Sequence, residues 1–307
     1  MEKWANRKKI RESHMTEDDA ADDEGAQEDM NELIETENGV LARMSDLLHY
    51  TRMSDLLHYT FIVFGADFVP LFEDLIPVFS PLLSSRQYGE RQWGLYMFND
   101  LIEFGGAPKT LQHSNVFLLA MVNALSDEYP EVRKAAAYGF GILAIKGGPD
   151  FAQTLAQALP HLVNLIGHPS ARSTEESIAA TEKAISAVAK ILKFNSSAVD
   201  INANIRVFLN WLPIWKDTDE APYVYGYFAD LVESNNPLVL GNLAGIVYII
   251  VEAFNKQAFD DKSDKENVRG RLVTILRSLQ GNNMLEGLVN EAKLDQTQQA
   301  VLHHLLQ

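Results

Sequence analysis

Downstream of about residue 41, apolar residues recur at the three- and four-residue spacing of an amphipathic helix, in one short segment after another. The segments are separated by brief stretches rich in Gly, Pro, Asn and Ser, which interrupt helices. The alternation of apolar and polar positions that is typical of a strand does not recur. The pattern therefore predicts an all-α protein.

Two of these segments match each other at both ends. ERQWGLYMFNDLIEFGGA begins at Glu90, and VRKAAAYGFGILAIKGGP begins at Val132. Arg91 and Arg133 lie 42 residues apart, and the same 42 residues separate the two Gly-Gly pairs that end the segments. Equal spacing at both ends indicates a structural repeat.

Three more segments extend this series at spacings of 48, 40 and 48 residues: ATEKAISAVAKILKFN from Ala180, EAPYVYGYFADLVESN from Glu220 and VRGRLVTILRSLQGNN from Val268. Equivalent apolar positions fall at i, i+4 and i+7, on one helical face. We therefore predict a shared buried stripe in five helices. Its members are Gly94, Phe98, Leu101; Ala136, Phe140, Leu143; Ala184, Val188, Ile191; Val224, Phe228, Leu231; and Leu272, Leu276, Leu279.

Another apolar helix precedes each of the five. These helices are FVPLFEDLIPVFSPLL, NVFLLAMVNALS, TLAQALPHLVNLIG, INANIRVFLNWLPIW and LVLGNLAGIVYIIVEAF, and Pro77 and Pro160 should bend two of them. A helix pair every 40 to 48 residues is the period of HEAT and armadillo arrays, and two helices per unit favour HEAT. We predict a HEAT-repeat α-solenoid of about six pairs, closed by a helix that Asp295 and Gln298 cap.

Composition divides the chain into a charged segment at 1–40 and the repeat array at 41–307. The net charge is -16, and the segment 12–37 carries twelve Asp and Glu with no Lys or Arg, which predicts a disordered acidic stretch. This stretch is a weak candidate for binding a basic partner, and a solvated insertion is the favoured interpretation. The candidate residues are Glu17, Asp18, Asp19, Asp22, Asp23 and Glu24.

The same composition argues against several other partners. Such an acidic chain has no basic patch for nucleic acid. No apolar run is long enough to insert into a membrane, and the charged start does not resemble a secretory signal. The absence of cysteine excludes disulfides and thiolate chemistry and fits a protein of the cytoplasm or nucleus.

Residue patterns for catalysis, cofactors and metals are missing, so we expect no enzyme activity. Gly139 and Gly141 lack the third glycine of a dinucleotide fingerprint, and close helix packing explains them better. His303 and His304 would point about 100° apart on a helix and cannot share a metal.

Trp211 and Trp215 could serve as stacking platforms for a ligand. Their spacing of four residues in a helical pattern favours packing in the core instead.

Asp127, in a turn, and Arg133, just inside the next helix, resemble the HEAT signature in which aspartate and arginine of successive repeats form a ladder. Two interpretations are open. A structural ladder that holds repeats together is favoured, and partner recognition through Arg133 is the alternative.

Several long motifs, in order, resemble the importin-beta superfamily, and within it the importin five or karyopherin beta-three branch. They include ERQWGLYMFNDLIE, YPEVRKAAAYGFGILAIKGG, WLPIWKDTDEA, LVESNNPLVLG and LDQTQQAVLHHLL. The resemblance runs from about residue 7 to 307 and corresponds to the C-terminal part of such a receptor.

This resemblance implies a superhelical HEAT receptor that carries protein cargo through nuclear pores, binds phenylalanine-glycine nucleoporins and releases imported cargo when Ran-GTP binds. The corresponding locations are the cytoplasm, the nucleus and the nuclear envelope at pores. A HEAT scaffold or regulatory subunit of another complex, of the phosphatase type, is the alternative.

The nonapeptide RMSDLLHYT occurs twice in succession, at 43–51 and 52–60. Nine residues of helix turn each side chain about half a turn away from its copy, so the two copies would face opposite ways. We predict that only one copy packs as a repeat helix does, and that the doubling is a tandem duplication or an assembly artefact.

Overall fold

The computed structural model describes residues 53–259, 264 and 266–307. The chain divides into two compact units, Met1–Tyr50 and Thr51–Gln307, and every described residue belongs to the second. The predicted acidic stretch and the first copy of the nonapeptide lie outside the described residues. The predicted boundary at residue 40 stays a prediction for the same reason.

Within the described residues the regular structure is entirely helical, and six helix pairs follow one another. The predicted stripe is carried by the second helices of the first five pairs. These are α4 (Tyr88–Phe104), α6 (Pro130–Lys146), α8 (Glu175–Phe194), α10 (Ala221–Glu233) and α13 (Val268–Gly281). The first helices are α3 (Val69–Phe79), α5 (Ala107–Ala124), α7 (Ala152–Ile166), α9 (Ile201–Asn210), and α11 (Pro237–Leu240) with α12 (Leu243–Asn255). The closing pair is α14 (Leu285–Glu291) and α15 (Gln296–Leu306).

Shorter helical elements complete the unit. Residues 53–64 form a helix ahead of the first pair. Four 3₁₀ turns lie between the longer helices: η1 (Gly65–Phe68), η2 (Ser80–Ser84), η3 (Pro149–Phe151) and η4 (Ser196–Ala198).

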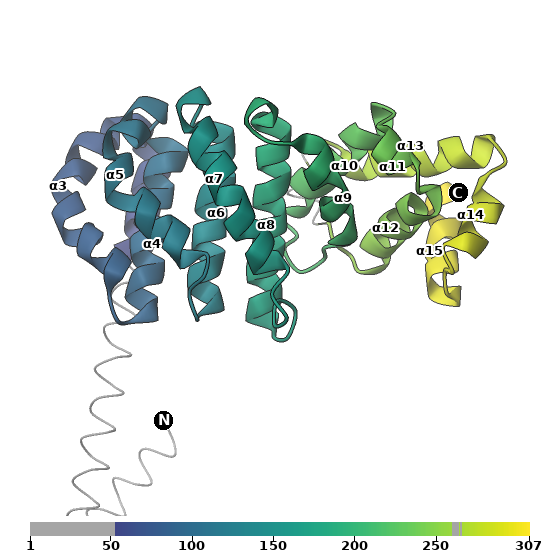
Figure 1. Ribbon diagram of the computed structural model, residues 1–307, viewed down its shortest axis with the longest axis horizontal. Coiled ribbons are helices and arrows are strands. Elements are labelled where there is room, and N and C mark those ends of the chain that lie inside the picture. The colour runs from purple at the N-terminus through teal and green to yellow at the C-terminus, as the bar shows by residue number, and fades with distance from the viewer. Residues whose placement is uncertain (1–52, 260–263, 265) are drawn as a thin grey trace, which may run out of the picture. The chain divides into compact units, whose positions relative to one another are not determined.

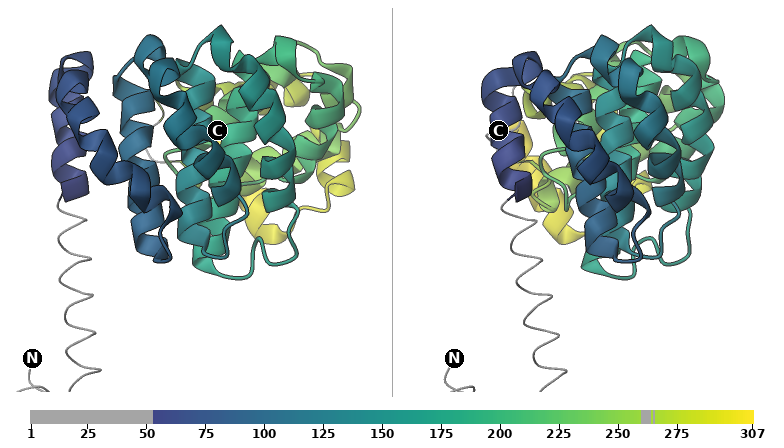
Figure 2. Two further views of the ribbon diagram at one scale, coloured as in Figure 1. Left: turned by 60° about the vertical axis from the view of Figure 1, so that its left-hand side comes forward. Right: turned by 90° about the vertical axis from the view of Figure 1, so that its left-hand side faces the viewer.

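The second helices pack on one another in chain order. α4 contacts α6, α6 contacts α8, α8 contacts α10, and α10 contacts α13, while each first helix lies beside the second helices of its own or the neighbouring pair. Figures 1 and 2 show these pairs stacked side by side within this unit. The predicted fold class, a HEAT-repeat solenoid of about six pairs, is confirmed.

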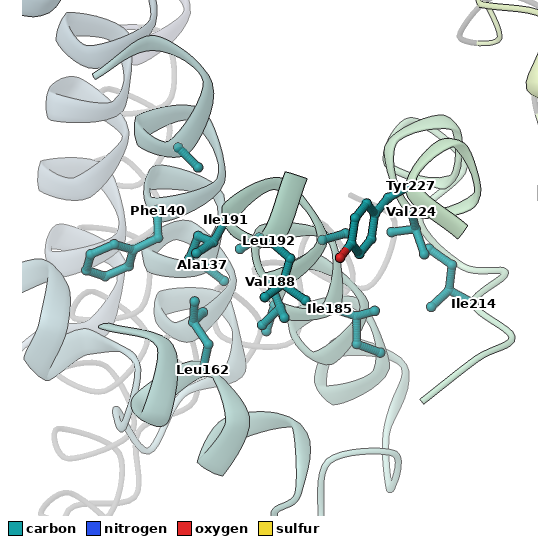
Figure 3. Close-up of a cluster of buried hydrophobic side chains, with 14 of the residues drawn as sticks. Ala137, Phe140, Leu162, Ile185, Val188, Ile191, Leu192, Ile214, Val224 and Tyr227 are labelled. Carbon is teal, nitrogen blue, oxygen red and sulfur yellow. The ribbon is translucent and has the colours of Figure 1, made fainter. Parts of the chain in front are cut away.

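The predicted stripe forms the core between these helices. Of its fifteen members, fourteen are buried, and Leu279, in the last turn of α13, is half-buried. Figure 3 shows Phe140 of α6, Leu162 of α7 and Val188 of α8 in one such cluster. Because the stripe is continuous from helix to helix, each repeat stabilises mainly its neighbours.

Each repeated Gly-Gly pair ends a helix. Gly105 and Gly147 donate their backbone N–H groups to Leu101 and Leu143, and a Cβ on either glycine would lie within 2.7 Å of that carbonyl oxygen. The following glycines, at 106 and 148, have φ of 85° and 76°, a conformation that side chains disfavour. The 42-residue spacing therefore marks equivalent helix ends.

Two helix boundaries differ from the sequence expectation. α9 ends at Asn210, because Pro213 cannot continue a helix, so Trp211 and Trp215 are not an i, i+4 pair on one helix. That part of the prediction is wrong, although both tryptophans do pack, half-buried, against the core. The helix expected over 238–254 is interrupted at Gly241 and Asn242, where Asn242 caps α12.

The predicted cap is confirmed, because Asp295 and Gln298 form a capping box at the start of α15. Pro77 and Pro160 lie inside α3 and α7, as the sequence placed them, and the bend expected at each stays a prediction. Both histidines at 303–304 are exposed.

The second copy of the nonapeptide places its two leucines about 100° apart on the helix at 53–64. Leu57 is 6% exposed and Leu56 is 62% exposed, so this copy faces the core through Leu57. The comparison with the first copy stays a prediction.

Candidate functional site

A series of charged side chains links successive repeats, and its first link joins Arg91 to Asp127. Arg91 is in the first turn of α4, and Asp127 is in the turn between α5 and α6. The guanidinium donates from Nε to Oδ2 at 2.7 Å and from Nη2 to Oδ1 at 2.9 Å. This two-point geometry is the strongest form of an arginine–carboxylate contact. The hydrogen bonds to Asp127 raise the pKa of Arg91, although burial opposes the increase.

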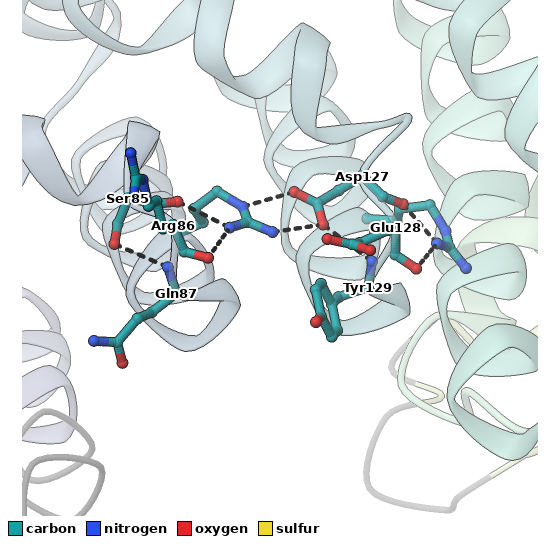
Figure 4. A network of polar contacts seen from close by, with 8 residues as sticks. Ser85, Arg86, Gln87, Asp127, Glu128 and Tyr129 are labelled. Atoms are coloured by element: carbon teal, nitrogen blue, oxygen red, sulfur yellow. Dashed lines mark hydrogen bonds and ion pairs between the residues drawn. The ribbon is translucent and has the colours of Figure 1, made fainter. Parts of the chain in front are cut away.

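Arg133 occupies the equivalent position in α6, but its bonds differ. Its Nη1 donates to the carbonyl oxygens of Asp127, at 2.6 Å, and Glu128, at 2.9 Å. Figure 4 shows these contacts beside those of the preceding turn. The carboxylate of Asp127 thus faces Arg91, whereas Arg133 contacts only the backbone of Asp127.

The residues proposed from the sequence therefore lie as follows. Asp127 and Arg133 are adjacent, but the side-chain link that joins two repeats runs from Arg91 to Asp127. The 42-residue spacing of Arg91 and Arg133 was the sequence signal for this link. The acidic candidates at 17–24 lie outside the described residues.

A second link is a buried cluster between α8 and the start of α10, which the sequence analysis missed. Lys190 contacts Glu220 at 2.6 Å, and Lys183 contacts Asp217 at 2.8 Å and Glu220 at 3.1 Å. Ser186 donates to Glu220 as well. The sequence did contain a signal for this cluster: Lys183 and Lys190 lie seven residues apart on the apolar face of a predicted helix.

The pKa values in this cluster reflect competition between burial and opposite charges. Burial alone would raise the pKa of Glu220, but Lys190 and Lys183 outweigh burial and lower it to about 2. The pKa of Lys183 is raised, because Glu220 and Asp217 together outweigh its burial. Burial prevails at Lys190 and lowers its pKa. Glu220 and Lys183 are thus ionised at neutral pH, and the balance depends on all members of the cluster.

Glu182 organises the loop between α9 and α10. Its carboxylate accepts the backbone N–H groups of Trp215, Lys216 and Asp217 at 2.7 to 3.0 Å. Its pKa is raised because it is buried, although these three hydrogen bonds oppose the increase. The loop is also held by the buried hydroxyl of Tyr225, which donates to the carbonyl oxygen of Ile214 at 2.7 Å.

A third link joins α10 to α13. Arg271 donates to Asp230 at 2.7 Å and to Glu233 at 2.6 and 3.0 Å, and Lys193 of α8 lies 2.8 Å from Asp230. Hydrogen bonds to Glu233 raise the pKa of Arg271 despite partial burial. Three successive second helices are thus joined through Asp230.

Aromatic side chains fill the intervals between these charges. Tyr138 of α6 donates to Glu103 of α4 at 2.7 Å, and Lys183 lies 5.3 Å from its ring centroid. Lys190 lies 4.1 Å from the ring of Tyr223, which is 45% exposed. These cation–π contacts hold the lysines over the rings, and part of the Tyr223 ring stays exposed.

The arrangement couples neighbouring repeats through charged side chains. Among the described residues, no group of three His, Cys, Asp or Glu side chains is placed to hold a metal. None of the described helices is long and apolar enough to cross a membrane. Cavities of about 160 Å³, beside α9 and α12, and about 440 Å³, beside Arg133, open between neighbouring repeats.

Known proteins resemble this chain in sequence and in fold. Residues 217–268 match the family described as the importin repeat. Importin subunit beta-3 of Saccharomyces cerevisiae is 26% identical over 193 residues, which are 62% of this chain and 18% of the yeast protein.

Solved structures of Kap121p share the fold. The structure of Kap121p bound to RanGTP aligns with a TM-score of 0.71 at 19% identity, over 89% of this chain and 25% of that one. Kap121p bound to Pho4p aligns with a TM-score of 0.68 at 17% identity, over 98% and 25%.

The fold and the linked charges define a HEAT-repeat solenoid. The importin repeat and the yeast relative show that the chain is similar to importin-beta proteins, and it spans about a fifth to a quarter of the length of those it matches.

Proposed function

We propose that this chain is the C-terminal portion of an importin-beta-type nuclear transport receptor. In this role it is a protein-binding scaffold for Ran-regulated import of protein cargo through nuclear pores. It acts by binding rather than by catalysis, in the cytoplasm, in the nucleus and at the pores.

The observation that carries the proposal is the importin repeat at 217–268 within a continuous array of HEAT pairs. This segment begins at Asp217, in the loop held by Glu182, and contains Glu220 and Asp230, so the matched residues include members of the links between α8, α10 and α13. Relatives of the array have been solved with RanGTP and with Pho4p, which supports a partner-binding role.

The geometry suggests how such a scaffold responds to partners. Repeats that contact chiefly their neighbours slide in small steps, and the links at Asp127, Glu220 and Asp230 set the relative positions of adjacent helices. A partner that spans several repeats can therefore favour one pitch of the array, which would couple cargo binding to Ran binding in a whole receptor.

Pull-down of the purified full chain tests the proposal. Immobilised phenylalanine-glycine repeats, Ran-GTP and Ran-GDP are the three baits, and circular dichroism first establishes that the chain is helical. We expect retention on the phenylalanine-glycine repeats or on Ran-GTP, and weaker retention on Ran-GDP.

A folded chain that binds none of these baits would overturn the transport role of this portion. Retention by a phosphatase catalytic subunit instead would favour the alternative, a regulatory scaffold of another complex.

A further inference from the structure

Arg133 makes the same two backbone hydrogen bonds as Arg91. The Nη1 atom of Arg91 donates to the carbonyl oxygens of the residues six and five positions earlier, Ser85 at 2.9 Å and Arg86 at 3.1 Å. Arg133 makes the same two bonds to Asp127 and Glu128, again six and five positions earlier. Figure 4 shows both turns with these bonds. The two guanidinium groups are therefore anchored alike.

The other edge of the guanidinium distinguishes the two arginines. Arg91 directs Nε and Nη2 to the carboxylate of Asp127, which lies 36 residues later in the sequence. The next repeat lines the cavity beside Arg133 with residues between 164 and 181, and none of these lining residues is Asp or Glu. Between described residues no carboxylate forms an ion pair with Arg133 within 4.0 Å. Among the described residues, Arg133 therefore has no counterpart of the Arg91–Asp127 ion pair.

The electrostatics of the two arginines differ accordingly. Hydrogen bonding to Asp127 raises the pKa of Arg91, whereas burial lowers the pKa of Arg133, although the nearby charges of Asp127 and Glu131 favour its ionised form. The guanidinium of Arg133 has thus lost water without gaining the carboxylate that its counterpart has.

A cavity of about 440 Å³ opens at Arg133, between the turn that precedes α6 and the segment 164–177. Its wall includes the hydroxyl-bearing residues Ser126, Ser170 and Thr174. The hydroxyl of Ser170 contacts His168, and the hydroxyl of Thr174 donates to Ser177. The cavity therefore offers space beside the unmatched edge of the arginine, with the Ser126 hydroxyl as a further donor.

We infer that Arg133 and this cavity form a docking site for an acidic side chain, Asp or Glu, of a partner protein. The partner carboxylate takes the position on Arg133 that Asp127 takes on Arg91 and accepts two parallel hydrogen bonds from Nε and Nη2. The inference rests on the proposed role as a protein-binding scaffold and adds the chemistry of one contact.

Neighbouring charges select a carboxylate over a phosphate. Glu128 lines the cavity, and Glu131 lies close enough to affect the ionisation of Arg133. A group with two negative charges would be repelled by both glutamates more strongly than a single carboxylate. The test must therefore distinguish phosphate binding from carboxylate binding.

Fluorescence anisotropy with short labelled peptides and the full chain measures the contact directly. One peptide carries a central Asp between neutral residues, and its partner carries Asn at the same place. We expect the Asp peptide to bind about tenfold more tightly, in line with charge-assisted bidentate pairing. A third peptide with phosphoserine reports phosphate binding.

Two variants assign the contact to Arg133. Arg133→Gln should remove the preference for Asp, while Lys146→Gln, an equal change in charge at the other end of α6, should keep it.

Equal affinity of the native chain for the Asp and Asn peptides would overturn the inference, as would a preference that survives Arg133→Gln. Tighter binding of the phosphoserine peptide than of the Asp peptide would overturn the carboxylate assignment. None of these outcomes bears on the pull-downs with Ran-GTP, so the inference can fail while the transport role stands.

Discussion

At the scale of single residues, the backbone of α6 approaches α4 and α5 closely at Gly139. A Cβ at this position would lie 2.3 Å from Oδ1 of Asn99 and 2.5 Å from the sulfur of Met121. Asn99 cannot easily move, because its Nδ2 donates to the carbonyl oxygen of Ala135 at 2.9 Å. The close packing predicted for this glycine is thus explained by two buried side chains, Asn99 of α4 in the preceding pair and Met121 of α5 in the same pair.

Gly139→Ala should therefore lower the free energy of unfolding by about 1–3 kcal/mol, the usual range for overpacking. Gly141→Ala is the matched control, because its Cβ would make only ordinary contacts of 3.4 Å or more. The control should be neutral or stabilising by up to about 1 kcal/mol, since alanine favours a helix more than glycine does. Urea unfolding measures both, and equal effects would contradict the contact geometry.

Glu220 predicts a dependence of stability on pH. Its folded pKa, about 2, lies below the ordinary value of 4.5, so the folded state favours the ionised carboxylate. The stabilisation is therefore complete above about pH 4.5 and is lost as the pH falls from there to about 2. Glu220→Gln should be about 3–5 kcal/mol less stable than the native chain at pH 7, because it leaves buried lysines uncompensated.

The difference between Glu220→Gln and the native chain should shrink as the pH is lowered from 5 to 3. Urea unfolding at several pH values measures it. Combining Glu220→Leu with Lys190→Met should recover much of the loss at pH 7, since an apolar pair replaces a buried ion pair. A difference that is constant with pH would show that the charge of Glu220 is not the cause.

At the scale of elements, the loop between α9 and α10 depends on one carboxylate from another helix. Glu182 of α8 accepts three backbone N–H groups from this loop, after Pro213 has ended the helical region. The loop also carries Asp217 into contact with Lys183. α8 therefore fixes the start of α10 through polar contacts as well as through the apolar stripe.

Glu182→Gln should lower the free energy of unfolding by about 2–3 kcal/mol, because an amide cannot accept all three bonds and leaves a buried donor unpaired. Amide hydrogen exchange across residues 211–219 should become faster. Glu175→Gln removes a carboxylate that contacts the same loop through Lys216, but this pair is exposed. The control should therefore change stability by less than about 1 kcal/mol, and a similar loss in both variants would contradict this role of Glu182.

At the scale of the whole array, stability should be local. The second helices contact one another in chain order, so a loss in one pair is transmitted mainly to its neighbours. Leu272 of α13 is fully buried between the last repeats, whereas α4 lies several repeats away. The effect of a substitution should therefore decline with distance along the series.

Leu272→Ala should cost about 2–5 kcal/mol locally through the cavity that it leaves. Hydrogen exchange should become faster in α13 and in the adjacent α10 and α14, and should stay nearly unchanged in α4. The matched variant Leu101→Ala, in the equivalent stripe of α4, should show the opposite distribution. A uniform acceleration throughout the array in either variant would indicate two-state unfolding instead.

The sequence by itself determined the repeat. Helical spacing placed Phe98, Phe140 and Phe228 on buried faces, and the Gly-Gly pairs marked equivalent helix ends, because periodicity and backbone conformation are local properties of the chain. The capping box at Asp295 was readable for the same reason. Sequence motifs also indicated the family.

Only the tertiary structure decided which partner each charged group has. Asp127 faces Arg91 rather than Arg133, and Glu220 joins two lysines from a helix that is 30 or more residues earlier in the chain. Such pairings depend on how one helix is rotated and shifted against the next, and the packing of whole stripes sets that placement. For this reason the unmatched edge of Arg133 became visible only in the folded array.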